Sequence, residues 1–405
     1  MTSRERVVRT LNFKESKAID LGGMLSTGIS CFAYPRLVEA LGLSYRRPRV
    51  HDIHQMLALP DSDVLDVLDC DVVTVHLDWW TNAFTEDQQW YPFDFGGRLE
   101  ALVQHPQRFA VLEDGSVTYE DNRGSLIMPP SSFVFNEQHG GQPLDLFSLD
   151  APKESLEEIE AQLRASQFTD EQLDSIESFC RKVRTSTDRA VFFNGVPMGL
   201  KYRGGMAAWS MICLTEPDYV KEVHELITTY RIRDYEQLIP RIAPYVDVFM
   251  TNSDDQGTQN APIMPPQTFT DLYVPYYRRM NDAIHQNAPQ MKTFLHSCGA
   301  IYSLLEAVIA SGFDVINPVQ WTAGGHSYHE WKDLSRGRLV LWGGGINSQG
   351  TLPLGTLEEI ACETAEVVKY LRTDGGFVFN SIHNILAEIE PQKVITMYEA
   401  AGRSF

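Results

Sequence analysis

Residues 292–320 read KTFLHSCGAIYSLLEAVIASGFDVINPVQ. Two short apolar runs, residues 292–296 and 314–319, flank a segment with the period of an amphipathic helix. A strand, a helix and a second strand in this order are typical of a βαβ unit, in which the two strands lie parallel. We therefore predict part of a parallel sheet here.

The same alternation recurs along the chain. Each further run rich in Val, Ile and Phe is followed by at least one helical segment; these runs are residues 18–22, 71–76, 190–195, 246–251, 339–342 and 377–380. Eight such units match a closed (β/α)₈ barrel better than an open, doubly wound sheet. We predict an α/β protein in which residues 1–405 form a single TIM barrel.

Residues 90–147 depart from this pattern. They lack helical period, and extended runs such as residues 117–119 stand between turns at residues 96–97, 114–115 and 129–130. We predict a β-rich insertion after the second strand, on the side of the barrel where loops surround the active site. Two roles are open for the insertion: a lid over the site, or a contact between subunits of a homo-oligomer.

The composition excludes some classes of protein. Lys and Arg total 34 and Asp and Glu total 54, so the net charge of −20 would repel a phosphate backbone and nucleic acid is not expected as a partner. The first residues lack the apolar run of a signal peptide, and no window reaches the length of a membrane span. We expect a cytoplasmic protein with no membrane contact.

The six cysteines lie too far apart for the dense framework of a disulfide-rich secreted protein. We expect reduced thiols throughout. Cys70, Cys180, Cys213 and Cys362 are each predicted to act as a small buried hydrophobic residue.

Polar residues follow seven of the eight predicted strands. In a barrel these positions come from different strands and converge on the catalytic face. Trp79 and Tyr202 are candidates for pocket walls, although large aromatic residues more often serve in packing. The full set of candidate substrate-binding residues is Asp78, Trp79, Tyr202, Asn252, Gln256, Gln259, Asn317, Gln320, Asn347 and Asn384.

His296 and Cys298 are separated by one residue. In an extended segment both side chains point the same way, so they can hold one metal ion, for which zinc is the natural candidate. The alternative is a structural histidine beside a buried thiol. The position at a strand end, followed by Gly299, favours a site but leaves both interpretations open.

Asp254 and Asp255 form a second candidate group. Either carboxylate can bind a cation, act as a base or orient a substrate, but adjacent residues on an extended backbone do not face the same way. A helix cap or a turn is the alternative. Because Asn252, Gln256 and Gln259 belong to the same polar loop, we expect a catalytic role for at least one of the two aspartates.

Several motifs in the carboxyl half resemble the uroporphyrinogen decarboxylase superfamily, and in particular its corrinoid-linked methyltransferase branch. The motifs are DDQGTQ at residues 254–259, HSCG at 296–299, GFDVINPVQ at 312–320, WGG at 342–344 and FNSIHNI at 379–385, followed by Pro391. The resemblance runs through most of the chain, but the decarboxylases proper do not share the insertion.

This resemblance implies a chemistry. In the family methyltransferases, His-x-Cys and a later cysteine hold a zinc that activates a thiol or assists demethylation, and a corrinoid (cobalamin) protein carries the methyl group. The first two ligands correspond to His296 and Cys298. His383 takes the place of the later cysteine, whereas Cys362 falls within a helix. Histidine is a competent zinc ligand, so a site of two histidines and one cysteine with an open fourth position still serves as a Lewis acid.

The leading hypothesis is a methyltransferase that moves a methyl group between a small methylated substrate, a methoxy compound or a methylamine, and a corrinoid protein. His296, Cys298 and His383 would bind zinc, while Asp254 or Asp255 and Asn317 would position the substrate.

Two alternatives remain. One is a metal-independent decarboxylase or lyase that uses His383 and an aspartate for proton transfer, because the decarboxylase branch also has a histidine at this place. Its arginine-bearing loop, however, has no counterpart at residues 25–30. The other is a noncatalytic barrel that binds a corrinoid or tetrapyrrole, which the many polar strand ends disfavour.

Overall fold

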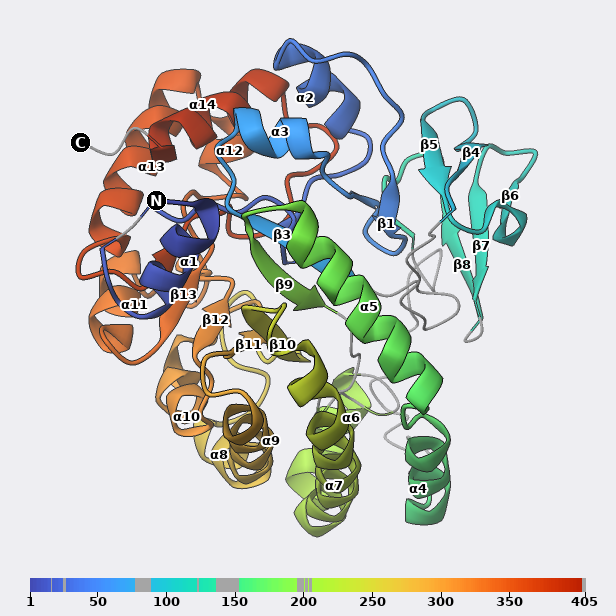
Figure 1. Ribbon diagram of the computed structural model, residues 1–405, viewed down its shortest axis with the longest axis vertical. Helices are drawn as coiled ribbons and strands as arrows, with labels where there is room; N and C mark the ends of the chain where they lie inside the picture. Colours follow the sequence, from blue (N-terminus) through green and yellow to red (C-terminus); the bar gives the residue numbers. More distant parts are fainter. Residues whose placement is uncertain are drawn as a thin grey trace.

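The computed structural model describes residues 1–15, 17–24, 27–76, 89–121, 124–135, 153–194, 200, 203 and 206–402. Its centre is a curved sheet of seven strands, all parallel (Figure 1). In spatial order the strands are β14 (Phe377–Val378), β13 (Val340–Trp342), β12 (Val315–Asn317), β11 (Lys292–His296), β10 (Val248–Ser253), β9 (Ala190–Asn194) and β3 (Val72–His76).

Residues 18–20 join the two edges of this sheet. On one side Phe379 donates its main-chain N–H to Ala18, and Asp20 donates to Phe379, each at 2.9 Å. On the other side the N–H of Asp71 donates to Ile19 at 2.7 Å. The chain therefore closes as a TIM-barrel-like fold, and the predicted fold class is confirmed.

The expected first strand over residues 18–22 is reduced to a single bridge between Ile19 and Phe379. The cause lies in the two glycines that follow. Gly22 has a φ of +73°, which turns the chain, and a Cβ at Gly23 would collide with Val72 and Asp20. The segment therefore leaves the sheet after Asp20.

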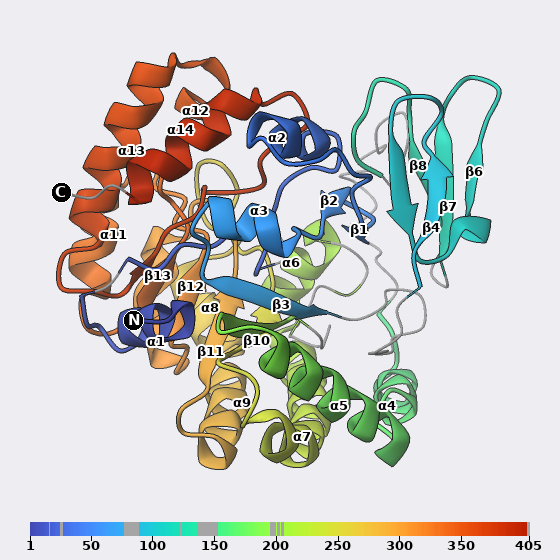
Figure 2. The ribbon, with the colours of Figure 1, turned by 45° about the horizontal axis from the view of Figure 1, so that its top comes forward.

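Helices surround the outside of the curved sheet (Figures 1 and 2). They are α1 (Ser3–Leu11), α2 (Tyr34–Ala40), α3 (Ser62–Val67), α4 (Leu156–Ala165), α5 (Asp170–Ser186), α6 (Met206–Thr215), α7 (Pro217–Ile242), α8 (Pro266–Leu272), α9 (Val274–Asn287), α10 (Leu305–Ala310), α11 (Tyr328–Ser335), α12 (Thr351–Leu354), α13 (Leu357–Leu371) and α14 (Pro391–Gly402). Capping boxes begin several of them; at α13, for example, Thr356 accepts from the N–H of Glu359 and the Glu359 side chain accepts from the N–H of Thr356. None of the helices in the described part of the chain combines the length and apolar character needed to cross a membrane.

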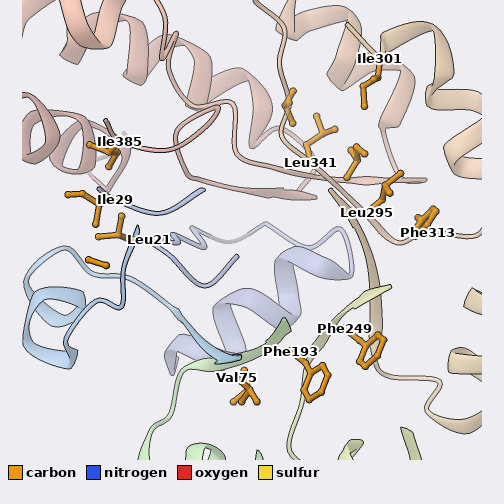
Figure 3. Packing of buried hydrophobic residues seen from close by; sticks show 14 of the residues in the cluster. Leu21, Ile29, Val75, Phe193, Phe249, Leu295, Ile301, Phe313, Leu341 and Ile385 are labelled. Atoms are coloured by element: carbon orange, nitrogen blue, oxygen red, sulfur yellow. The ribbon is translucent and has the colours of Figure 1, made fainter. Parts of the chain in front are cut away.

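Two apolar cores lie on opposite faces of the sheet, because successive side chains of a strand point alternately to one face and to the other. Inside the barrel, the rings of Phe192 and Phe294 meet edge to face at 4.7 Å, and Trp342 packs against Phe192 at 5.7 Å and against Phe294 at 5.5 Å. Between the sheet and the helices lies the larger core, where Phe193 stacks on Phe249 at 5.1 Å (Figure 3). Phe192 and Phe193 are neighbours in sequence and serve different cores.

Trp342 also links the inner core to the closure of the barrel. Its indole N–H donates to the carboxylate of Asp20 at 2.9 Å. The main-chain N–H of Gly23 donates to the same carboxylate at 2.8 Å. Burial raises the pKa of Asp20 to about 6, although these donors oppose the rise. A buried carboxylate held by several donors thus fixes the segment that joins the two sheet edges.

A separate group of antiparallel strands stands beside the barrel, next to the pair β1 (Val50–Asp52) and β2 (Leu57–Ala58) (Figure 2). These strands are β4 (Tyr91–Asp94), paired with β5 (Glu100–Val103), and the three-stranded sheet β6 (Phe109–Val111), β7 (Val117–Asp121) and β8 (Gly124–Met128). Two main-chain hydrogen bonds tie the group to the barrel, from Leu102 to Pro48 at 2.8 Å and from Phe135 to His54 at 2.9 Å. Residues 136–147 of the expected insertion lie outside the described residues.

All six cysteines are free thiols. Cys70, Cys180 and Cys213 are buried as predicted, but the prediction for Cys362 is wrong because this side chain is exposed on α13. The buried stripe of α13 includes Ile360. A residue two positions further along a helix points about 200° away, so Cys362 falls on the opposite, solvent-facing side.

Candidate metal centre

Three potential metal ligands meet at the carboxyl end of the barrel. His296 is the last residue of β11, Cys298 lies two residues further on, and His383 lies in the loop after β14. One ligand atom from each residue lies within 4.8 Å of the other two. The two imidazole rings are 6.3 Å apart between centroids and inclined by 64°. Although β11 and β14 are separated in the sheet by two strands, their loops bring these residues together.

The protonation states of His383 and Cys298 are compatible with the binding of a divalent cation. Burial, together with the nearby His296, lowers the pKa of His383 to about 4, so this imidazole is neutral at pH 7 and has a lone pair available. Burial and the adjacent Asp255 carboxylate raise the pKa of the Cys298 thiol. A bound cation reverses this effect because it stabilises the thiolate. Two nitrogen donors, one sulfur donor and a neighbouring carboxylate form a set that zinc favours.

Asn317 at the end of β12 fixes the orientation of His296. The amide N–H of Asn317 donates to the carbonyl oxygen of Trp342 at 2.9 Å, so its Oδ1 faces His296. His296 Nδ1 lies 2.6 Å from that Oδ1 and must therefore carry the proton. The other ring nitrogen, Nε2, therefore has a lone pair that can bind a metal. Histidines that bind metals in known proteins are oriented in the same way, by a hydrogen bond from the second ring nitrogen.

Asn317→Leu is expected to weaken zinc binding by about 10- to 100-fold, because His296 loses the acceptor that sets its tautomer. Competition with a chromogenic chelator measures the affinity. Asn317→Asp keeps an acceptor at the same place and is the matched control, expected to retain most of the affinity. Equal affinity in the leucine variant and the wild type would show that Asn317 does not position the ligand.

Asp255 lies next to the cluster of His296, Cys298 and His383 but is not one of its three potential ligands. Its Oδ1 accepts the main-chain N–H of Cys298 at 2.9 Å and lies 3.6 Å from His296 Nε2. Burial acts to raise the pKa of Asp255, but His296 and the hydrogen bond from Cys298 more than offset it, so the pKa lies below its ordinary value. The carboxylate is ionised at pH 7 and adds a negative charge beside the cluster.

Two glycines bring the loops of Asp255 and Cys298 into contact. Gly257 lies against the main chain of residues 298–300, and Gly299, with a φ of +91°, lies against the main chain of Gly257. A Cβ at either position would collide with the opposite backbone. This close approach holds Asp255 next to Cys298.

A comparison with models of protein families identifies the chain. The model of uroporphyrinogen decarboxylase (URO-D) matches residues 160–404, which is more than half of the sequence. The chain belongs to the URO-D family. The family predicted from the motifs is thus confirmed, and the match covers His296, Cys298 and His383.

A comparison with solved structures gives matches to this URO-D protein over almost its whole length. A methyltransferase from Methanosarcina mazei has a TM-score of 0.51 and 14% sequence identity, and the match covers 99% of this chain and 98% of that one. A GH53 catalytic domain from Ignisphaera aggregans has a TM-score of 0.36 and 11% identity, with 96% of this chain and 99% of that one covered. A sequence comparison with curated proteins gives no match.

The two adjacent aspartates of this URO-D protein have different surroundings. Asp254 is buried, and its carboxylate accepts from the amide of Asn252 and, at 2.5 Å, from the hydroxyl of Tyr277 on α9. Asp254 is thus bound into the packing against α9, whereas Asp255 faces His296. Of the two, Asp255 is placed to act in the site.

The other expected substrate-binding residues divide in a similar way. Gln320 lies beside the cluster, since its Oε1 accepts the N–H of Gly299 at 2.7 Å. Asn347 accepts from the main chain of Gly350 at 2.9 Å and shapes its own loop. Gln259 is exposed and lies 3.3 Å from Gln349. Asp78, Trp79 and Tyr202 lie outside the described residues.

Gln256 has a buried side chain whose amide atoms have no hydrogen-bond partner among the described residues. Its main-chain N–H donates to the hydroxyl of Ser297 at 3.0 Å, which connects the loop after β10 to the His-x-Cys segment.

Two residues with a structural role were not among the candidates from the sequence: Ser297 in this site and Asp20 at the closure of the barrel. The only signal for Asp20 was an acidic residue inside an otherwise apolar run.

Proposed function

We propose that this protein is a corrinoid-linked methyltransferase that moves a methyl group between a small methylated substrate and a corrinoid protein. The observation that carries the proposal is the convergence of His296, Cys298 and His383, with ligand atoms within 4.8 Å of one another. Similarity in fold to the methyltransferase from Methanosarcina mazei over almost the whole chain supports it. The proposed metal is one zinc ion.

The donor set fits zinc in a catalytic site, where three protein ligands leave a fourth position for the substrate. When bound there, zinc supplies a Lewis acid that polarises the heteroatom bearing the methyl group. Asn317 orients His296 through its 2.6 Å hydrogen bond, and Asp255 holds the main chain of Cys298. Asn317 and Asp255 thus hold two of the potential ligands in position in the absence of substrate.

Methyl transfer to free cob(I)alamin tests the function. Zinc-loaded protein is expected to methylate cob(I)alamin from at least one donor in a panel of methoxy and methylamino compounds, as followed by the absorbance of methylcobalamin. Chelation should lower the rate by at least about 100-fold, because the polarising cation contributes several kcal/mol to such reactions. Addition of zinc should restore the rate, whereas magnesium should not.

The same assay separates the alternatives. No transfer from any donor by zinc-loaded protein would favour a lyase or a noncatalytic carrier. One observation already disfavours a decarboxylase that acts on a carboxylated tetrapyrrole. The described residues that line a cavity of about 540 Å³ beside His383 include no Arg or Lys to bind such a substrate.

A further inference from the structure

A turn between β1 and β2 contacts the loop that carries His383. The turn spans residues 53–56, and its Gln55 meets Asn384, the residue directly after His383. The amide of Asn384 donates to Gln55 Oε1 at 2.6 Å. This hydrogen bond joins the proposed metal centre to a segment that lies 329 residues away in the sequence.

Further hydrogen bonds extend this contact into a chain. The amide Nε2 of Gln55 donates to Oδ2 of Asp52 at 3.2 Å, and the main-chain N–H of Gln55 donates to Oδ1 of the same carboxylate at 2.9 Å. At the other end, Oδ1 of Asn384 accepts the main-chain N–H of Gly28 at 3.1 Å. The chain therefore runs from a carboxylate, through two side-chain amides, to a main-chain N–H.

The two ends of this chain fix the orientation of both amides. A carboxylate offers acceptors, whereas a main-chain N–H can only donate. Gln55 must therefore turn its NH₂ group toward Asp52, and Asn384 must turn its oxygen toward Gly28. Rotation of either amide by half a turn would place two donors or two acceptors against each other. The chain thus admits one arrangement of its side chains.

The chain is also shielded from water. Asp52 and Asn384 are buried, with 3% and 7% of their surface exposed. Burial raises the pKa of Asp52, and the N–H groups of Gln55 oppose the rise. Buried hydrogen bonds that share their partners strengthen one another, and a buried polar group that loses its partner costs free energy. A change at Asp52 is therefore expected to be felt at Asn384.

Main-chain hydrogen bonds fix both segments that this chain connects. In the turn, the carbonyl oxygen of His54 accepts from the N–H of Phe135, in the β-rich insertion, at 2.9 Å. In the loop after β14, the carbonyl oxygen of Ile385 accepts from the N–H of Ser30 at 2.9 Å. The backbone beside Gln55 and the backbone beside Asn384 are thus held independently of the chain between them.

We propose that Asp52 and Gln55 are positioning residues for the metal centre, because they fix Asn384 and thereby the adjacent His383. The inference rests on the proposed function, in which His383 is one of the three zinc ligands. The other two ligands have direct supports: His296 contacts Asn317, and the main chain of Cys298 donates to Asp255. The chain from Asp52 supplies the corresponding support for His383.

An exchange of the two side chains tests the proposal. Asp52→Asn leaves one acceptor oxygen for two N–H groups of Gln55, and Gln55→Glu places two carboxylates against each other. Each change is expected to weaken zinc binding about 3- to 10-fold, the effect of losing one hydrogen bond. Competition with a chromogenic chelator measures the affinity.

The double variant Asp52→Asn, Gln55→Glu is expected to bind zinc within about 2-fold of the wild type. In it, the amide at position 52 donates to the carboxylate at position 55, which still accepts from Asn384. The order of donors and acceptors is thus restored with the charge moved by three positions. Affinity in the double variant no better than in the weaker single variant would overturn the proposal.

Asp247→Asn is the matched control. Asp247 is also a buried carboxylate that accepts a main-chain N–H, from Val191 at 2.9 Å, but it precedes β10 and so lies at the end of the barrel opposite the cluster. This variant should keep the zinc affinity of the wild type even where its melting temperature falls. Equal weakening in Asp247→Asn and Asp52→Asn would overturn the proposal, because general loss of stability would explain both. Gln55→Leu, which removes both amide hydrogen bonds, carries the test where Asp52→Asn does not fold.

A second measurement, made without metal, separates this proposal from the proposed function. In chelator-treated protein labelled with ¹³C at histidine Cε1, the NMR signal of His383 is identified by its absence in His383→Gln. Asp52→Asn and Gln55→Glu should each shift this signal, and the double variant should return it toward its original position. These shifts in a protein that binds no zinc would contradict the function and support the positioning role. Unchanged signals and unchanged zinc affinity in both single variants would overturn the positioning role and leave the function intact.

Discussion

Cys298→Ala is expected to lower the zinc content from about one ion per chain to less than about one tenth, because two imidazoles alone form a weak site for zinc. Cys298 provides the only sulfur atom in the cluster. Its removal also takes away the negative charge that a bound thiolate would contribute. Plasma mass spectrometry after dialysis against a zinc buffer measures the ratio of metal to protein.

Cys362→Ala is the matched control for this experiment. Cys362 is exposed on α13 and lies outside the cluster, so this variant should keep one zinc per chain. A further variant, His383→Cys, replaces one good zinc ligand with another and should also keep the metal. Full zinc occupancy in Cys298→Ala would contradict the assignment of this residue as a ligand.

Trp342→Ala is expected to lower the free energy of unfolding by about 3–5 kcal/mol or more, the usual cost of truncating a large buried aromatic side chain. Trp342 is fully buried and packs against both Phe192 and Phe294 inside the barrel. The same change leaves the Asp20 carboxylate without its indole donor. Urea denaturation at pH 7, followed by circular dichroism, measures the loss.

Trp342→Phe separates packing from hydrogen bonding. This variant keeps most of the ring contacts and loses the bond to Asp20, so we expect a smaller loss of about 1–3 kcal/mol. Leu354→Ala, at a side chain that is 83% exposed, should change stability by less than about 0.5 kcal/mol. A loss in Trp342→Ala no larger than that of Leu354→Ala would show that the closure of the barrel does not depend on this core.

Local patterns were sufficient to predict most of the barrel. The strand predicted at residues 292–296 has those bounds in the structure, and the strands after it lie within the predicted runs. The first strand differs because its pairing is limited by tertiary contact: Gly23 must pack against Val72, which no local pattern reveals. The exposure of Cys362, in contrast, could have been predicted from the helical period of α13, and the prediction of a buried side chain was wrong.

The metal centre could be predicted only in part from spacing. His296 and Cys298 share a strand end, so their proximity follows from local geometry. His383 lies almost ninety residues further on and was included because of the family resemblance. Which of the two adjacent aspartates faces the cluster depends on Tyr277 of α9, which binds Asp254 from a different element. The insertion was expected at the active-site end of the barrel from its position after the second strand, but the sequence did not indicate that its residues 131–135 would line a cavity beside His383.

X-ray absorption spectroscopy at the zinc edge tests the central claim of a mixed site most directly. For zinc-loaded protein we predict one sulfur neighbour at about 2.3 Å and two imidazole nitrogens at about 2.0–2.1 Å, with a fourth light atom completing the shell. These neighbours correspond to Cys298, His296 and His383. A shell without sulfur, or one with two sulfur atoms, would contradict the assignment of this centre.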